Sequence, residues 1–180
     1  MLLKKVLKTL VLLFMVVPPW ACAAESPNIL DAILAEDISG FNKAIKRIEN
    51  PTFYTDKLGT KHILLGAAAY SKNLEFTKQL IAAGADVGAE NQVGETALFD
   101  TIIACNIPAA KMQLEKGAHL RHKNSLGFTP LHSAALSQCP DIVKLFLQYG
   151  ADKSIINREG LTAYELALKM KNARLAAELK

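Results

Sequence analysis

Histidines supply the first candidates for chemistry in this 180-residue chain, because imidazole is a common metal ligand and proton carrier. His119 and His122 lie in one short stretch, and His132 follows it. A zinc ion needs three or four protein ligands that converge on one point. Arg121 and Lys123 flank His122, and their positive charges oppose a bound cation. We therefore expect no metal site here.

Cysteines and carboxylates are the other candidates for catalysis. A thiol enzyme built on Cys105 would need a nearby base to form its thiolate, and the sequence positions no histidine or acid for that role. The carboxylates Glu95, Asp100 and Glu159 are scattered along the chain, and no glycine-rich phosphate-binding loop is present. We therefore expect neither enzymatic activity nor a cofactor.

The stretch from Met1 to Ala23 has the pattern of a secretory signal. MLLKKVLK is basic, TLVLLFMVV is apolar, and ACAAESP follows two prolines and a tryptophan. Ala21 and Ala23 fit the small residues of a cleavage site, so we expect cleavage after Ala23 and export to the periplasm. Two alternatives are an uncleaved anchor, for which the apolar run is short, and a lipid on Cys22, which Pro19 and Trp20 disfavour.

The charge of the chain belongs largely to this leader. The whole sequence has 21 basic and 17 acidic residues, a net charge of +4. Removing Lys4, Lys5 and Lys8 with the leader leaves 18 basic and 17 acidic residues, a net charge of +1. A nearly neutral mature chain lacks the positive field of a nucleic-acid-binding protein, and we expect no membrane contact after cleavage.

The rest of the chain repeats itself at a constant interval. GETALF begins at 94, GFTPLH at 127 and GLTAYE at 160, and a Gly-Ala pair begins at 84, 117 and 150. Two independent marks with one spacing indicate an internal structural repeat.

One unit of this repeat predicts two helices. Thr129 suits a helix N-cap, and Pro130 suits the first helical position. Pro140 and Asp141 begin a second, bulkier apolar run, and Gly150 is suited to end it in the left-handed conformation. A single helix pair cannot bury its own apolar face, so neighbouring pairs must stack into an array.

GFTPLHSAA at 127–135 and YGADKSIIN at 149–157 closely resemble the signature of the ankyrin repeat family. The resemblance implies an all-α ankyrin-repeat solenoid of helix–turn–helix units with β-turn loops. It covers residues 24–180, with repeats at about 56–90, 91–123, 124–156 and 157–180 and capping units at both ends. Residues 28–50 resemble a degenerate N-terminal cap, and 49–61 is expected to be a longer loop than usual.

The resemblance also bears on individual side chains. His132 stands where the family has a structural histidine that bonds nearby backbone, whereas Phe99 and Glu165 replace it in other repeats. Cys105 and Cys139 occupy neighbouring slots of adjacent repeats, at the turn between paired helices. An exported protein permits a disulfide between them, and two buried free thiols are the alternative.

Ankyrin repeats usually bind proteins through loop tips and the exposed side of the first helix, on a concave face. By register, the expected partner-binding residues are Tyr70, Val93, Glu95, Ile103, Leu126, Phe128, Leu136, Arg158 and Leu161. Several are apolar where a solvated surface would be polar, and exposed apolar surface marks interaction sites. The alternative is that these side chains fold sideways onto the next repeat.

The resulting expectation is a monomeric, non-catalytic periplasmic protein that binds a protein partner. It could inhibit a toxic enzyme, as an immunity protein does, or support a resident periplasmic enzyme, for example in oxidative-stress defence. A secreted effector acting in a host is a further alternative. The sequence does not separate these roles, because a scaffold fixes where binding occurs and not what is bound.

Overall fold

Short helices follow one another in pairs along the described part of the chain. The computed structural model describes residues 28–55 and 60–180, so the expected leader at 1–23 lies outside the described residues. The pairs are α2 (Ile29–Leu34) with α3 (Ile38–Ile45), α4 (Leu64–Tyr70) with α5 (Leu74–Ala82), α6 (Ala97–Ala104) with α7 (Ile107–Glu115), α8 (Pro130–Leu136) with α9 (Pro140–Gln148), and α10 (Ala163–Lys169) with α11 (Ala173–Leu179). The predicted array of helix–turn–helix units is confirmed.

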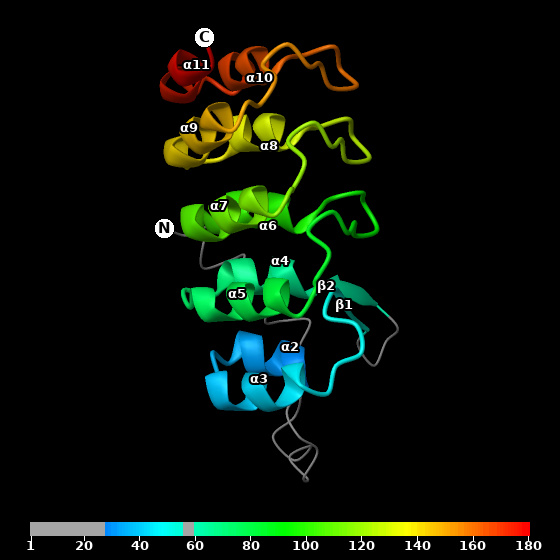
Figure 1. The fold of residues 1–180 in the computed structure, drawn as a ribbon. Helices are drawn as coiled ribbons and strands as arrows, with labels where there is room; N and C mark the ends of the chain where they lie inside the picture. The colour runs from blue at the N-terminus through cyan, green and yellow to red at the C-terminus, as the bar shows by residue number, and fades with distance from the viewer. Residues whose placement is uncertain (1–27, 56–59) are drawn as a thin grey trace, which may run out of the picture.

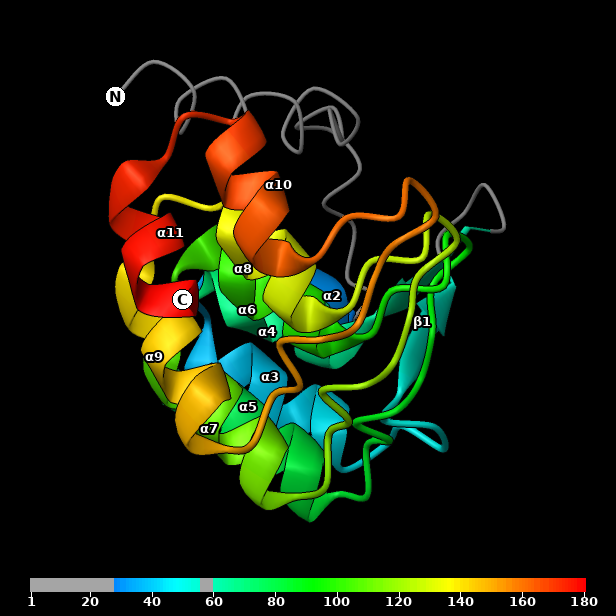
Figure 2. The same ribbon diagram turned by 90° about the horizontal axis from the view of Figure 1, so that it is seen from above.

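The pairs stack in chain order into an elongated array, with the N-terminal pair α2–α3 at one end and α10–α11 at the other (Figure 1). Seen along the stack, the first helix of each pair lies in one column and the second helix in another, and the loops project to one common side (Figure 2). Each first helix contacts the first helix of the next pair. Equivalent positions in successive repeats therefore line up along one face.

Reciprocal side-chain bonds set the start of the first helices α8 and α10. At α8 the Thr129 hydroxyl accepts from the His132 backbone N–H (3.4 Å), and His132 Nδ1 accepts from the Thr129 N–H (3.2 Å). At α10 Thr162 and Glu165 form the same reciprocal pair. Such a capping box satisfies two backbone donors that a helix start leaves free. Glu165 therefore replaces the histidine without loss of the cap.

Glycines end the second helices as the sequence predicts. Gly150 follows α9 with a φ of 81°, in the left-handed region that a side chain disfavours. Gly127, in the loop before α8, has a φ of 77°, and a Cβ there would lie 2.9 Å from the backbone nitrogen of Arg158. This second glycine allows the loops of adjacent repeats to approach closely.

The buried apolar side chains of the described residues form two clusters. One is centred on α2 to α5, where the rings of Phe41 and Phe76 meet edge to face with centroids 4.9 Å apart. The other runs from α6 to α11 and includes Phe146. Thr77 on α5 and Gln113 on α7 are fully buried polar residues close to this division. The two clusters meet at Val87, which packs against both.

The described residues at the two ends of the expected loop, the insertion at 49–61, form a short strand pair. β1 (Phe53–Thr55) and β2 (Lys61–Ile63) pair antiparallel, with Phe53 opposite Ile63. The Thr52 hydroxyl accepts from the Asp86 N–H at 3.0 Å, and the Thr52 carbonyl accepts from the Leu64 N–H. The insertion is thus anchored to α4 and to the loop after α5.

Candidate protein-binding site

Three apolar side chains form an aligned, exposed row on the first helices. Tyr70 of α4, Ile103 of α6 and Leu136 of α8 are 45%, 51% and 42% exposed. They occupy the same position in three successive repeats, and their helices stack directly on one another. We call these three residues the docking row. All three side chains keep a solvent-exposed part, although the Tyr70 hydroxyl reaches Asp100 of the next repeat.

A carboxyl–phenol pair lies at the N-terminal end of the docking row. The Tyr70 hydroxyl donates to Asp100 Oδ1 at 3.2 Å. The Asp100 carboxyl group lies against Gly66, where even a Cβ would collide with it. Burial raises the pKa of Asp100 from 3.8 to about 6, a rise reinforced by the charge of Glu95 and opposed by the Tyr70 hydrogen bond. The same burial and the Asp100 charge hold the pKa of Tyr70 above its usual value.

Buried and half-buried asparagines shape the loops that precede the first helices. The side-chain oxygen of Asn124 accepts from the backbone N–H groups of Leu126 and Phe128, both at 3.0 Å. Asn91 and Asn157 make the equivalent pairs of bonds in their own loops. These asparagines occupy the same position in successive repeats, a signal that the prediction from sequence missed.

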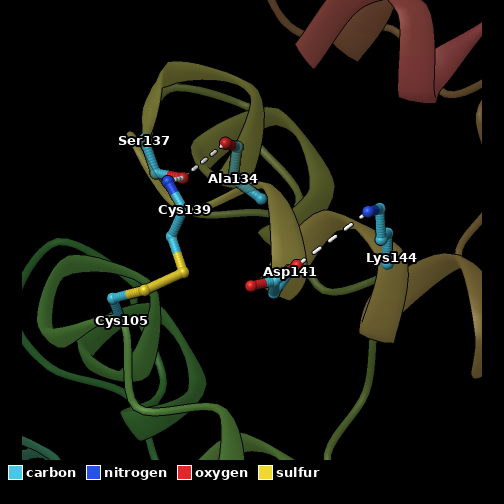
Figure 3. Close-up of a disulfide and its surroundings, with 6 residues drawn as sticks. All are labelled: Cys105, Ala134, Ser137, Cys139, Asp141 and Lys144. Atoms are coloured by element: carbon cyan, nitrogen blue, oxygen red, sulfur yellow. Dashed lines mark hydrogen bonds and ion pairs between the residues drawn. A yellow bond between two sulfur atoms is a disulfide. The ribbon is translucent and has the colours of Figure 1, made fainter. Parts of the chain in front are cut away.

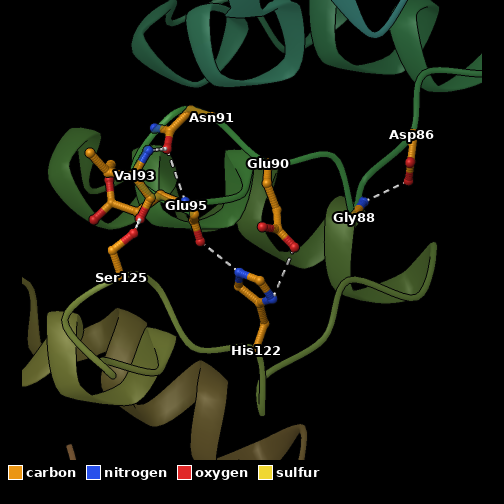
Figure 4. A network of polar contacts seen from close by, with 9 residues as sticks. Asp86, Gly88, Glu90, Asn91, Val93, Glu95, His122 and Ser125 are labelled. Atoms are coloured by element: carbon orange, nitrogen blue, oxygen red, sulfur yellow. Dashed lines mark hydrogen bonds and ion pairs between the residues drawn. The ribbon is translucent and has the colours of Figure 1, made fainter. Parts of the chain in front are cut away.

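Loop tips of successive repeats are also bonded to one another. The Ser125 N–H and hydroxyl both donate to the Val93 carbonyl, at 2.9 and 2.8 Å (Figure 4). The Arg158 N–H donates to the Leu126 carbonyl at 3.4 Å. The side chains of Val93 and Leu126 remain 52% and 62% exposed. The tips therefore present apolar side chains from a backbone that neighbouring loops hold in place.

The nine expected partner-binding residues divide into two groups. Arg158 is exposed, as are the docking row, Val93 and Leu126. Glu95, Phe128 and Leu161 are partly buried. Glu95 accepts from the Asn124 side-chain amide at 2.9 Å, and the Phe128 ring stacks on His132 at a centroid distance of 5.8 Å. Glu95 and Phe128 thus contact the next loop or helix, as the alternative of side chains folding onto the neighbouring repeat describes.

His122 and His132 are held by protein groups. His122 Nε2 lies 2.6 Å from the Gly94 carbonyl, and its Nδ1 lies 3.7 Å from a carboxylate oxygen of Glu90 (Figure 4). His132 Nε2 lies 3.0 Å from the Leu161 carbonyl of the next repeat. Burial lowers the pKa of His132. Within residues 28–55 and 60–180, no group of three or more potential ligands is arranged to hold a metal ion.

Cys105 and Cys139 are joined by a disulfide, with their Cα atoms 5.8 Å apart (Figure 3). Cys105 is the C-cap of α6, and Cys139 is the N-cap of α9. The bond therefore crosses from one repeat to the next at the end of the first helices, away from the loops. While this bond is intact, neither sulfur is a free thiol that could act as a nucleophile.

A family model described as ankyrin repeats in three copies matches residues 64–157. The chain belongs to the ankyrin repeat family. Ankyrin repeats are protein-interaction modules and are typically not catalytic. The matched residues include α4 to α9 and all three residues of the docking row.

Known proteins with ankyrin repeats resemble this chain over part of their length. A Fowlpox virus protein named for its ankyrin repeats is 34% identical over 108 residues, covering 59% of this chain and 18% of the relative. Human protein phosphatase 1 regulatory subunit 27 is 31% identical over 67 residues, 37% of this chain and 44% of the relative. The mouse RelA-associated inhibitor is 33% identical over 89 residues, which cover 49% of this chain and 11% of the relative. The chain thus spans less than half the length of each relative.

The ankyrin stack offers a surface for another protein. Exposed apolar side chains on rigid, aligned backbone can bury area in a complex without first having to be ordered, which limits the entropic penalty of binding. Aromatic anchors such as Tyr70 often contribute most of the binding energy in such interfaces. None of the helices in the described ranges combines the length and apolarity needed to cross a membrane.

Proposed function

We propose that this protein is exported to the bacterial periplasm and there binds a protein partner through the concave face formed by its first helices and loop tips. The observation that carries the proposal is the docking row, three exposed apolar side chains at equivalent positions of successive repeats. Exposed apolar surface of this kind on a soluble scaffold is typical of a binding site. The loop-tip residues Val93 and Leu126 extend the same apolar character toward the loops.

The proposed location is supported by the leader pattern at 1–23 and by the disulfide. Disulfides persist in oxidising compartments such as the periplasm and are uncommon in the bacterial cytosol. The leader would bring the chain into that compartment before Cys105 and Cys139 pair.

The proposed action is inhibition of a toxic enzyme in the manner of an immunity protein. A rigid face that covers an active site can block it without any chemistry of its own. Two of the relatives carry names of regulators, a phosphatase regulatory subunit and an inhibitor. Support of a resident periplasmic enzyme uses the same face and is distinguished by what the partner does.

Site-specific photo-crosslinking tests this proposal. A photoreactive phenylalanine analogue replaces Leu136 in the docking row, and a matched one replaces Gln148 at the exposed end of α9. We expect one periplasmic protein to crosslink at position 136 and not at 148. An enzyme whose activity falls on adding the purified protein supports inhibition, and one whose activity or lifetime rises supports the accessory role. Equal crosslinking at both positions, or only in the cytosol, contradicts the proposal.

A further inference from the structure

The cysteine pair stands at positions where other residues would suit the helices better. Cys105 has a φ of 50°, a left-handed conformation that glycine or asparagine adopts with less strain. Cys139 occupies the N-cap slot that holds Asn106 in the preceding repeat and Asn172 in the following one. Those asparagines accept backbone hydrogen bonds, whereas Cys139 makes no side-chain cap bond. Both cysteines therefore carry a local penalty that the disulfide between them must offset.

The disulfide crosses the junction between α6 and α8, which lies within one apolar cluster that extends to α11. The first helices α6 and α8 contact each other less extensively than α4 contacts α6 or α8 contacts α10. Hydrogen bonds from Ser125 to Val93 and from Asn124 to Glu95 join the two repeats at the loop end. At the opposite end of α6 and α8 the junction is closed by the disulfide.

The docking row lies at that opposite end. Ile103 precedes Cys105 by two residues, and Leu136 precedes Cys139 by three. The preceding junction has a tie in the same place, since the Asn106 side-chain amide donates to the carbonyls of Ala69 (2.9 Å) and Ser71 (3.2 Å), on either side of Tyr70. Hydrogen bonds at one junction and a covalent bond at the next thus connect the ends of the three row-bearing helices.

We propose that the Cys105–Cys139 disulfide sets the spacing of Ile103 and Leu136, so that the docking row is complete only in the oxidised protein. This inference rests on the proposed function for its biological meaning, but its structural part stands alone. A dithiol reductant supplies two electrons and two protons. The S–S bond breaks, two cysteine thiols form, and the dithiol closes to its own disulfide. The row would then respond to the redox state of its surroundings.

Hydrogen–deuterium exchange on the full chain tests the structural part. We compare the oxidised protein, the protein reduced with dithiothreitol, and the Cys105→Ser/Cys139→Ser variant. Loss of the bond is expected to raise amide exchange by about tenfold or more in α8 and the last turn of α6. Helices α2 to α5 should change much less. Unchanged exchange, or an equal rise in every helix, overturns the proposal.

A second variant separates positioning from overall stability. Cys105→Gly/Cys139→Asn supplies the residues that the left-handed position and the N-cap prefer, and so recovers local helix stability without the bond. We expect this variant to keep the faster exchange at the end of α6 and in α8. If its exchange there equals that of the oxidised protein, the disulfide does not position the row.

The photoreactive probe at position 136 then tests the binding part. Crosslinking that falls severalfold on reduction supports the proposal, and crosslinking that is insensitive to reduction overturns its binding part. If no partner is captured under oxidising conditions, the proposed function fails while the exchange experiment still decides whether the disulfide fixes the row. The two ideas can therefore fail separately.

Discussion

Replacing Asp100 with asparagine should stabilise the protein at neutral pH and leave its stability in acid nearly unchanged. Asp100 is a partly buried carboxyl group whose pKa rises from 3.8 to about 6 in the fold. The Tyr70 hydroxyl donates a hydrogen bond to it, and the charge of Glu95 disfavours its ionised form. An asparagine keeps the acceptor for the Tyr70 hydroxyl and removes the charge.

The magnitude follows from the difference between the two pKa values. Below pH 3.8 the carboxyl is protonated in both the folded and the unfolded protein, so the free energy of unfolding carries no ionisation penalty. Between pH 3.8 and about 6 the unfolded chain ionises first, and stability falls with rising pH. Above pH 6 the loss is complete, at up to about 3 kcal/mol for a shift of this size.

Urea denaturation of the wild type and of Asp100→Asn from pH 3.5 to 7.5 measures this difference. Subtracting the two curves removes the contribution of His132, whose lowered pKa makes stability fall as pH drops below its unfolded value near 6.5. Tyr70→Phe removes the bond that lowers the Asp100 pKa and should move the transition to higher pH. Asp141→Asn, on an exposed carboxyl group of α9, controls for the substitution itself. A difference that does not vary with pH would refute the reasoning.

Three further predictions concern single side chains. Gln113→Leu should raise the free energy of unfolding by about 1–3 kcal/mol in urea denaturation, because neither amide atom of this buried side chain has a partner among the described residues. Leu136→Asp should abolish crosslinking from a probe at position 103 while the circular dichroism stays unchanged; a melted fold would show that Leu136 is core. His132→Ala should lower the melting temperature by several degrees, since it removes the side-chain acceptor for the Thr129 N–H and the bond to the Leu161 carbonyl; an unchanged melting temperature would contradict this.

The constant interval between repeats was sufficient to predict most of the fold. Repeated Gly-x-Thr and Gly-Ala pairs marked where helices begin and end, because caps and left-handed turns depend on residue type within a few positions. The same interval predicted the alignment of Tyr70, Ile103 and Leu136. It also contained the loop asparagines Asn91 and Asn124, which could have been found by the same comparison.

Contacts that depend on side-chain direction could not be predicted from the sequence. From the sequence, Phe128 and Leu161 were predicted to be exposed loop residues, but the Phe128 ring stacks on His132. From the sequence, Asp100 was one of several scattered carboxylates. Its burial against Gly66 depends on how two neighbouring repeats pack together. The one-residue offset between the registers of Cys105 and Cys139 left both a disulfide and two free thiols compatible with the repeat. Each of these depends on distances between repeats that a period alone does not give.

The repeat that carries Ile103 is held to its two neighbours by different means, and this makes it the position where the docking row can be altered. Toward the N-terminus, the extensive packing of α4 against α6 is supplemented by the hydrogen bonds of Asp100 and Asn106. Toward the C-terminus, the junction depends on the disulfide. Stacked repeats are stabilised mainly by contacts with their nearest neighbours, so a change at either junction moves Ile103 relative to one end of the row.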